Sequence, residues 1–122
     1  MSDYVGIYLG PNDSSIAVWW NWKAEIIPND NSSKDSAGRT TPSVVSFTKN
    51  ERLVGEGAKN NIIKNPKNTI YGIREIIGKK FDEPEVQNFI KKVPFKIEKD
   101  SKTNKPKIIV EFRNEIKSYY PE

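Results

Sequence analysis

The side chains that most often carry enzymatic chemistry are missing from this sequence. Its 122 residues include no cysteine and no histidine. Disulfides, thiolate zinc sites and cysteine nucleophiles are therefore excluded, and the usual general base and commonest metal ligand are absent. A serine–histidine triad and histidine-based zinc catalysis cannot be built from this chain alone. Carboxylates, hydroxyls, cations and backbone groups are what remains for chemistry.

One segment of such groups, Gly10-Pro11-Asn12-Asp13, has the composition of a tight turn. Its glycine frees the backbone, its proline fixes φ, and its Asn and Asp side chains can bond to their own main chain. Segments rich in β-branched and aromatic residues lie around it and are typical of strands. They predict an antiparallel meander with strands at Tyr4–Leu9, Ser14–Trp20 and Lys23–Ile27.

The elements predicted beyond the meander are both helices and strands. A polar loop is expected from Pro28 to Gly38. Helical spacing predicts three helices, and the apolar face of the first would hold Ala58, Ile62 and Ile63. The second would begin at a Thr69 cap, end at Gly78 and place Ile70, Ile73, Ile76 and Ile77 on one face. The third would bury Val86, Phe89, Ile90 and Val93. Strands are expected at Ser43–Thr48, Arg52–Val54, Phe95–Lys99, Ile108–Phe112 and Ile116–Tyr120. The predicted fold class is mixed α+β.

Charge and aromatic residues raise the question of nucleic-acid binding. The net charge is +4, and residues 46–122 hold seventeen basic and eleven acidic side chains. A basic half can attract phosphate backbones. The lysines alternate with acids and apolar residues, as in Lys96-Ile97-Glu98-Lys99, which favours solvated faces of strands and helices. Trp19, Trp20 and Trp22 could form a binding patch, but packing is the commoner role. Nucleic-acid binding is therefore the weakest of the readings.

Colinear segments of the sequence resemble the opening of the seventy-kilodalton heat-shock chaperone family. Taken together, they run nearly end to end and in the family's order, which makes the resemblance specific. They are Val5-Gly6-Ile7-Tyr8-Leu9-Gly10, Glu25-Ile26-Ile27-Pro28-Asn29-Asp30, Arg39-Thr40-Thr41-Pro42-Ser43, Glu51-Arg52-Leu53-Val54-Gly55, Ala58-Lys59-Asn60, Asn65-Pro66-Lys67-Asn68-Thr69, Ile76-Ile77-Gly78-Lys79-Lys80-Phe81-Asp82 and Ser118-Tyr119-Tyr120-Pro121-Glu122.

The resemblance implies part of an actin-like, ribonuclease-H-type ATPase fold. Residues 1–38 would be the β-meander of the inner subdomain, with its phosphate-type hairpin and long polar loop. Residues 39–122 would be an α+β module like the outer subdomain of lobe I. In this family the first hairpin turn cradles ATP phosphates, the carboxylate that ends strand one holds hydrated magnesium, and a lysine orients the attacking water.

Carried over to this chain, the family's site positions hold different residues. Tyr8 stands where the family has aspartate, and Arg74 falls on the lysine position. In the phosphate turn Gly10 is retained, whereas Pro11, Asn12 and Asp13 replace two threonines and usually a tyrosine. A tyrosine adds no carboxylate to a magnesium shell, and Pro11 has no N–H to donate. Asp13 would repel a phosphate about 4 Å away by about 4 kcal/mol at an effective dielectric of 20.

These departures predict a damaged hydrolysis site, with no metal site of its own. ATP or ADP with magnesium is implied by the resemblance, but weak or no binding is expected here. A guanidinium at Arg74 is a planar fork and not the point charge of a lysine. Whether the chain is an enzyme stays open, and it is expected to be inactive alone. Gly10–Asp13 could also be a simple hairpin turn, and Arg74 a solvated charge.

The sequence supports two hypotheses about function. The first is a fragment or truncated, divergent member of the chaperone family, related to ATP-dependent protein folding and to the stress response. The second is a non-enzymatic module that keeps the lobe-I surface and binds co-chaperones, the ribosome or itself. Apolar strand residues of the meander favour self-association as a dimer or by strand exchange, because exposed strand edges template pairing. These residues are Val5, Ile7, Leu9, Ile16, Val18 and Trp20.

The sequence also bears on where the protein works. Its longest apolar runs are far short of the ~20 residues that span a bilayer. The first residues are polar and include Asp3, so no secretory signal is expected. We therefore expect a cytoplasmic protein without a membrane segment.

Overall fold

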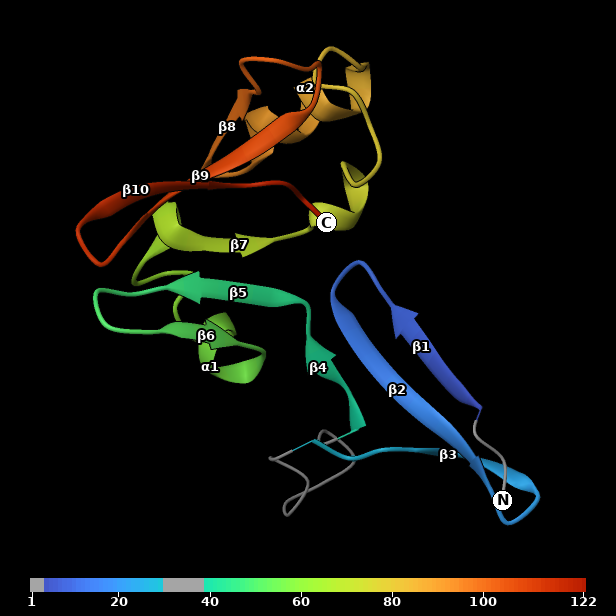
Figure 1. Cartoon of the computed structure of the whole chain (residues 1–122). Coiled ribbons are helices and arrows are strands. Elements are labelled where there is room, and N and C mark those ends of the chain that lie inside the picture. Colours follow the sequence, from blue (N-terminus) through green and yellow to red (C-terminus); the bar gives the residue numbers. More distant parts are fainter. Residues whose placement is uncertain (1–3, 30–38) are drawn as a thin grey trace.

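The computed structural model describes residues 4–29 and 39–122, and its N-terminal part is an antiparallel sheet. In this sheet β2 (Asp13–Trp20) pairs with β1 (Val5–Leu9) along one edge. Its other edge pairs with β3 (Lys23–Ile26) and with the two-residue β4 (Thr41–Pro42) (Figure 1). The predicted meander is confirmed. The short β4 was not predicted, and it ties the chain after residue 39 back to β2.

The other strands form two three-stranded antiparallel sheets. One is ordered β6–β5–β7, with β5 at Val44–Phe47, β6 at Arg52–Val54 and β7 at Thr69–Tyr71. The other is ordered β10–β9–β8, with β8 at Lys96–Lys99, β9 at Pro106–Phe112 and β10 at Glu115–Tyr119. Apart from β7, these strands lie where the sequence predicted strands, and those of β8 and β9 were predicted from alternation.

Two hairpins turn through residues in the left-handed region. Asn21 (φ 50°) and Trp22 (φ 62°) join β2 to β3, while Arg113 (φ 54°) and Asn114 (φ 63°) join β9 to β10. Positive φ at both central residues is the mirror-image turn whose twist matches that of paired strands. The side chain of Trp22 stands at such a turn and is 92% exposed.

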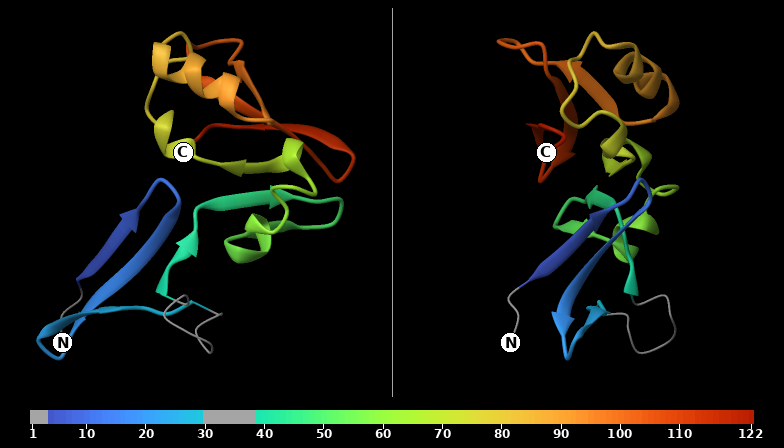
Figure 2. Two further views of the ribbon diagram at one scale, coloured as in Figure 1. Left: turned by 180° about the vertical axis from the view of Figure 1, so that it is seen from behind. Right: turned by 90° about the vertical axis from the view of Figure 1, so that its right-hand side faces the viewer.

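The hydrophobic core lies between helix α2 (Pro84–Lys92) and the two later sheets. α2 buries Val86 and Phe89 and has Pro84 in its first turn, where a missing N–H costs nothing. The buried core residues are Phe47, Ile70, Ile76, Val86, Phe89, Phe95, Ile97, Ile108 and Val110. The β1–β2 hairpin stands apart from α2 and the β8–β10 sheet in both views of Figure 2.

The first two predicted helices are wrong in extent or in kind. Helix α1 spans only Glu56–Lys59, and Ile63 is 91% exposed instead of lying on a buried face. The second is replaced by a 3₁₀ turn η2 (Pro66–Asn68), β7 and a 3₁₀ turn η3 (Ile73–Glu75).

The reason for the second error is local. Gly72 adopts φ 69°, and an ideal Cβ there would lie 3.1 Å from the Phe89 ring. This left-handed residue interrupts any helix between Ile70 and Ile73. Thr69 is a buried residue of β7 and does not begin a helix, and its hydroxyl donates to the Asn65 carbonyl (2.7 Å).

The polar loop predicted at Pro28–Gly38 is described only at its first two residues. Most of Pro28–Gly38 lies outside the described residues, because the structure describes nothing from 30 to 38. Asn29, just before this gap, donates from its Nδ2 to the carbonyl of Thr40 just after it (2.9 Å). Across residues 4–29 and 39–122, no helix has the length and apolar character needed to cross a membrane.

Candidate functional site

The turn between β1 and β2 is closed by its own backbone. The Gly10 N–H donates to the Asp13 carbonyl over 2.9 Å. An ideal Cβ at Gly10 would lie 2.4 Å from that carbonyl oxygen and 2.7 Å from Cε1 of Tyr8. The turn therefore requires glycine, and the Tyr8 ring lies directly against it.

Ser43 holds the turn against the rest of the chain. Its N–H donates to the Asn12 carbonyl (2.8 Å), and its hydroxyl shares a 2.7 Å hydrogen bond with Ser14. The same hydroxyl reaches the Gly10 carbonyl at 3.4 Å. The sequence reasoning assigned no role to Ser43, although it lies in the segment Arg39–Ser43 that carries part of the family resemblance. Its proximity to Asn12 follows from the pairing of β2 with β4.

A depression of about 260 Å³ opens beside this turn. Its lining includes Pro11, Asn12 and Asp13 together with Lys59 of α1 and Gly72. The volume lies below the range of about 300–1,000 Å³ typical of small-molecule pockets. Lys59 and Gly72 therefore lie beside the predicted turn residues, although nothing in the sequence connected them with the turn.

Arg74 is not among the residues that line this depression. It lies in η3 with an exposed side chain, two residues beyond Gly72. Tyr71 and Gly72 are the residues of this segment that reach the depression. The structure therefore brings the turn residues together with Ser43, Lys59 and Gly72, but it does not bring Arg74 to them.

The groups present at the turn do not fit a magnesium nucleotide bound as the family resemblance implies. The Gly10 N–H is already used inside the turn, and Pro11 has none to offer. Tyr8 has a hydroxyl in place of the carboxylate that the resemblance implies, and Asp13 adds an exposed acidic side chain to the turn. Hydrated magnesium is held in such sites chiefly by carboxylates. In the part of the chain that the structure describes, no three acidic side chains gather into a group that could hold a metal.

A second polar cluster surrounds Asp100, which is only 8% exposed. Its carboxylate accepts hydrogen bonds from the hydroxyls of Thr103 (2.7 Å) and Tyr120 (3.1 Å) and pairs with the Lys107 ammonium (3.2 Å). The Thr103 hydrogen bond, helped by Lys107 and Tyr120, lowers the pKa of Asp100 to about 2 in spite of the opposing effect of burial. Both carboxylate oxygens of Asp100 already have partners. The cluster therefore joins the β8–β9 turn to the segment after β10.

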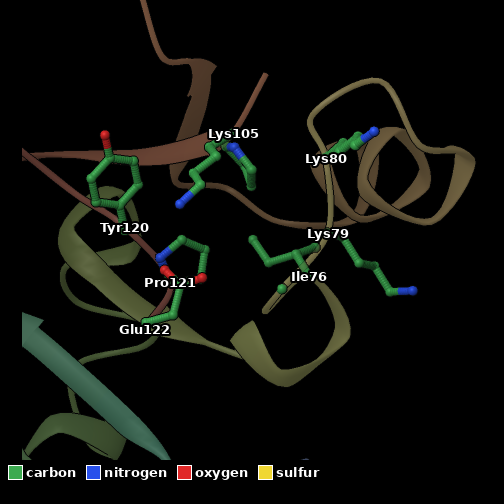
Figure 3. A pocket seen from close by; sticks show the side chains of 9 residues that line it. Ile76, Lys79, Lys80, Lys105, Tyr120, Pro121 and Glu122 are labelled. Carbon is green, nitrogen blue, oxygen red and sulfur yellow. The ribbon is translucent and has the colours of Figure 1, made fainter. Parts of the chain in front are cut away.

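A pocket of about 280 Å³ lies next to that cluster. Three lysines line it, but Figure 3 shows that Lys79 and Lys80 extend away from Lys105. The Lys105 ammonium lies 5.5 Å from the centre of the Tyr120 ring, a cation–π distance. The three cations therefore do not converge on one point where an anion could bind.

Comparisons with known proteins identify the family that this chain resembles. A family model described as Hsp70 protein matches residues 4–122. The chain is 43% identical over all its 122 residues to "Heat shock 70 kDa protein 2" of Paracoccidioides lutzii and 45% identical to "Heat shock 70 kDa protein" of Neurospora crassa, covering 18% of each relative. It is 42% identical over 118 residues (97% of this chain) to human "Putative heat shock 70 kDa protein 7", of which it covers 30%. The chain therefore spans well under half of the length of these relatives.

Proposed function

Because this chain belongs to the Hsp70 family, we propose that it is a divergent part of the family's nucleotide-binding domain that does not hydrolyse ATP by itself. In residues 4–29 and 39–122, the mixed α/β architecture of small sheets and two α-helices is that of a fragment of the Hsp70 actin-like ATPase domain. Its place in a chaperone cycle, in the stress response and in the cytoplasm belongs to the same proposal. So does the division into a meander of residues 1–38 and a module of residues 39–122.

The observation that supports a loss of ATP hydrolysis is the closed Gly10–Asp13 turn, against which the Tyr8 ring packs. The Gly10 N–H bonds within the turn, and the Tyr8 ring takes the space beside Gly10. A phosphate placed here would meet the carboxylate of Asp13 and the ring of Pro11. Electrostatic stabilisation by preorganised donors is usually the largest catalytic effect in phosphoryl transfer, and this turn has lost it.

Phosphate release by the purified chain tests the proposal on activity. We expect no turnover with magnesium and ATP above the rate of a blank. Turnover that persists through further purification and disappears in a Gly10→Trp variant would overturn the proposal, because tryptophan at this position cannot fit the closed turn.

Weak nucleotide binding is tested by melting temperature, which rises when a ligand binds the folded state. We expect no rise with micromolar Mg-ADP. A variant with Pro11→Thr and Asp13→Thr restores an N–H and removes the acid, and it should show a rise. Glu115→Thr removes an exposed acid in β10 and serves as the control for net charge. A clear rise in the parent chain at micromolar nucleotide would contradict the expectation.

A second role is favoured by the exposed residues of the meander. Ile7, Trp20 and Trp22 are large apolar side chains that face solvent. Contiguous exposed apolar surface marks interaction sites. We propose that the meander is an interaction surface, toward a co-chaperone, the ribosome or a second copy of this chain. Pull-down with each of these partners, compared between the parent chain and Ile7→Lys, tests this role.

A further inference from the structure

The turn between β8 and β9 gathers lysines at one end of the molecule. This end also holds α2 and lies away from the β1–β2 hairpin (Figures 1 and 2). Residues 99–107 read Lys-Asp-Ser-Lys-Thr-Asn-Lys-Pro-Lys, with four lysines and one acid. That acid, Asp100, is buried and pairs with Lys107. The turn therefore presents three exposed cations, the turn lysines Lys99, Lys102 and Lys105.

The turn lysines have no acidic partner in the described chain. Lys96, earlier in β8, pairs with Glu98 (2.8 Å), but across residues 4–29 and 39–122 no ion pair includes a turn lysine. Asp82 contacts the turn as well, and there it accepts a hydrogen bond from the Asn104 side chain (2.9 Å). Covering ammonium groups without supplying a carboxylate is costly. A molecule that covers this turn must therefore be acidic itself.

The backbone of the turn is held in place and keeps donors to spare. The Asp100 N–H donates to the Lys105 carbonyl (2.8 Å), and the Phe81 N–H donates to the Asn104 carbonyl (2.9 Å). In the described chain, the N–H groups of residues 101–103 donate to no other group. These residues line a hollow of about 490 Å³ together with Lys99 and Asn104. Successive backbone N–H groups in a turn suit an anion.

The arrangement of the charges favours an extended acidic peptide over a nucleic acid. Lys99 and Lys105 flank the base of the turn, and Lys102 lies three residues from each, so a ligand needs repeated charges to reach all of them. The turn contains no arginine, the residue that grips phosphate with two parallel bonds. The ring of Tyr120 beside it is already in cation–π contact with Lys105 (5.5 Å) and Lys107 (5.1 Å). It therefore offers bases no open platform for stacking.

We propose that the β8–β9 turn binds an acidic peptide segment of a partner protein. The turn lysines face its aspartate and glutamate side chains, and the N–H groups of residues 101–103 donate to its oxygens. Because all the charges involved are exposed, the contact is weak and sensitive to salt. The turn lies outside both the Gly10–Asp13 turn and the meander, so this interaction is separate from the roles proposed for them.

Fluorescence anisotropy with a short labelled oligo-aspartate peptide tests the proposal on the purified chain. We expect binding at about 20 mM salt that weakens by about tenfold or more at about 200 mM. Changing the three turn lysines together to glutamine should weaken binding at low salt by about tenfold. The matched control changes three exposed lysines outside the turn, which have no ion pair in the described chain, and should stay within about twofold of the parent. These are Lys49→Gln, Lys64→Gln and Lys67→Gln.

A second probe and a single substitution complete the test. An unlabelled single-stranded oligonucleotide of the same length should compete less well than unlabelled oligo-aspartate. Lys102→Glu changes one exposed side chain and should weaken peptide binding too, which keeps the proposal testable if the triple variant does not fold. Absence of binding at low salt, equal loss in the turn and control variants, or stronger competition by the oligonucleotide would each overturn the proposal.

Discussion

Gly10 shows how one residue fixes the candidate site. A Cβ at this position would lie 2.4 Å from the Asp13 carbonyl oxygen, closer than real Cβ contacts come. Gly10→Ala should therefore lower the free energy of unfolding by about 1–3 kcal/mol, the usual cost of overpacking. Gly57→Ala is the matched control, because nothing lies within 4 Å of a Cβ there, and alanine should stabilise α1 by up to about 1 kcal/mol. Urea unfolding measures both, and equal effects would contradict the geometry of the turn.

Asp100 gives the residue-scale prediction for pH. Its pKa is about 2 in the folded chain and ordinarily 3.8. The unfolded state therefore binds more protons between these values, so stability rises with pH there. The contribution of Asp100 is full above about pH 4 and is lost as the pH falls toward 2. The parent chain should lose stability over this window more steeply than Asp100→Asn. Parallel curves for the two proteins would show that the carboxylate has no favourable partners in solution.

At the scale of elements, the sequence predicts strands better than helices. Alternation in β8 and β9 is strict and places Ile97, Ile108 and Val110 in the core as expected. The isoleucines from Ile70 to Ile77 match helical spacing equally well, yet the chain forms β7 and η3. Pairing of β7 with β5 and the left-handed Gly72 beneath Phe89 decide between the two, and both depend on residues distant in sequence.

The same limit applies to the candidate site. The turn residues Gly10–Asp13 could be recognised because turn chemistry is local. Ser43, Lys59 and Gly72 could not, because only the pairing of β2 with β4 and the packing of α1 bring them beside the turn. The side chain of Arg74 was connected with the turn by the family resemblance, and it lies exposed in η3.

One pair of substitutions tests which of the predicted helical residues are buried in the folded chain. Phe89 of α2 is buried and faces Phe95, with 6.0 Å between ring centres, so Phe89→Ala should cost about 3–5 kcal/mol. Ile63, which helical spacing placed on a buried face, is almost fully exposed. Ile63→Ala should therefore change the free energy of unfolding by no more than about 0.5 kcal/mol. A large loss for Ile63→Ala in urea unfolding would restore the longer helix that the spacing predicted.

At the scale of the whole molecule, the chain combines a well-packed part around α2 with a meander, β1–β3, that contributes nothing to the core. The core cluster runs from Phe47 to Val110 and includes no residue of β1, β2 or β3. All of β1 is exposed, and the meander is joined to the rest through β4 and the Ser43 hydrogen bonds. Segments with few buried apolar contacts open at lower free energy than core segments. The meander should therefore unfold first.

The tryptophans make this order measurable. All three of them, Trp19, Trp20 and Trp22, lie in β2 or in the turn that follows it. Tryptophan fluorescence therefore reports the meander alone, while far-UV circular dichroism reports every strand and helix. With both probes at the same protein concentration, the fluorescence transition should come at lower urea than the dichroism transition. Non-coincident transitions indicate more than one cooperative unit. Superimposable curves would mean that the β4 pairing and the Ser43 contacts couple the meander to the core as one folding unit.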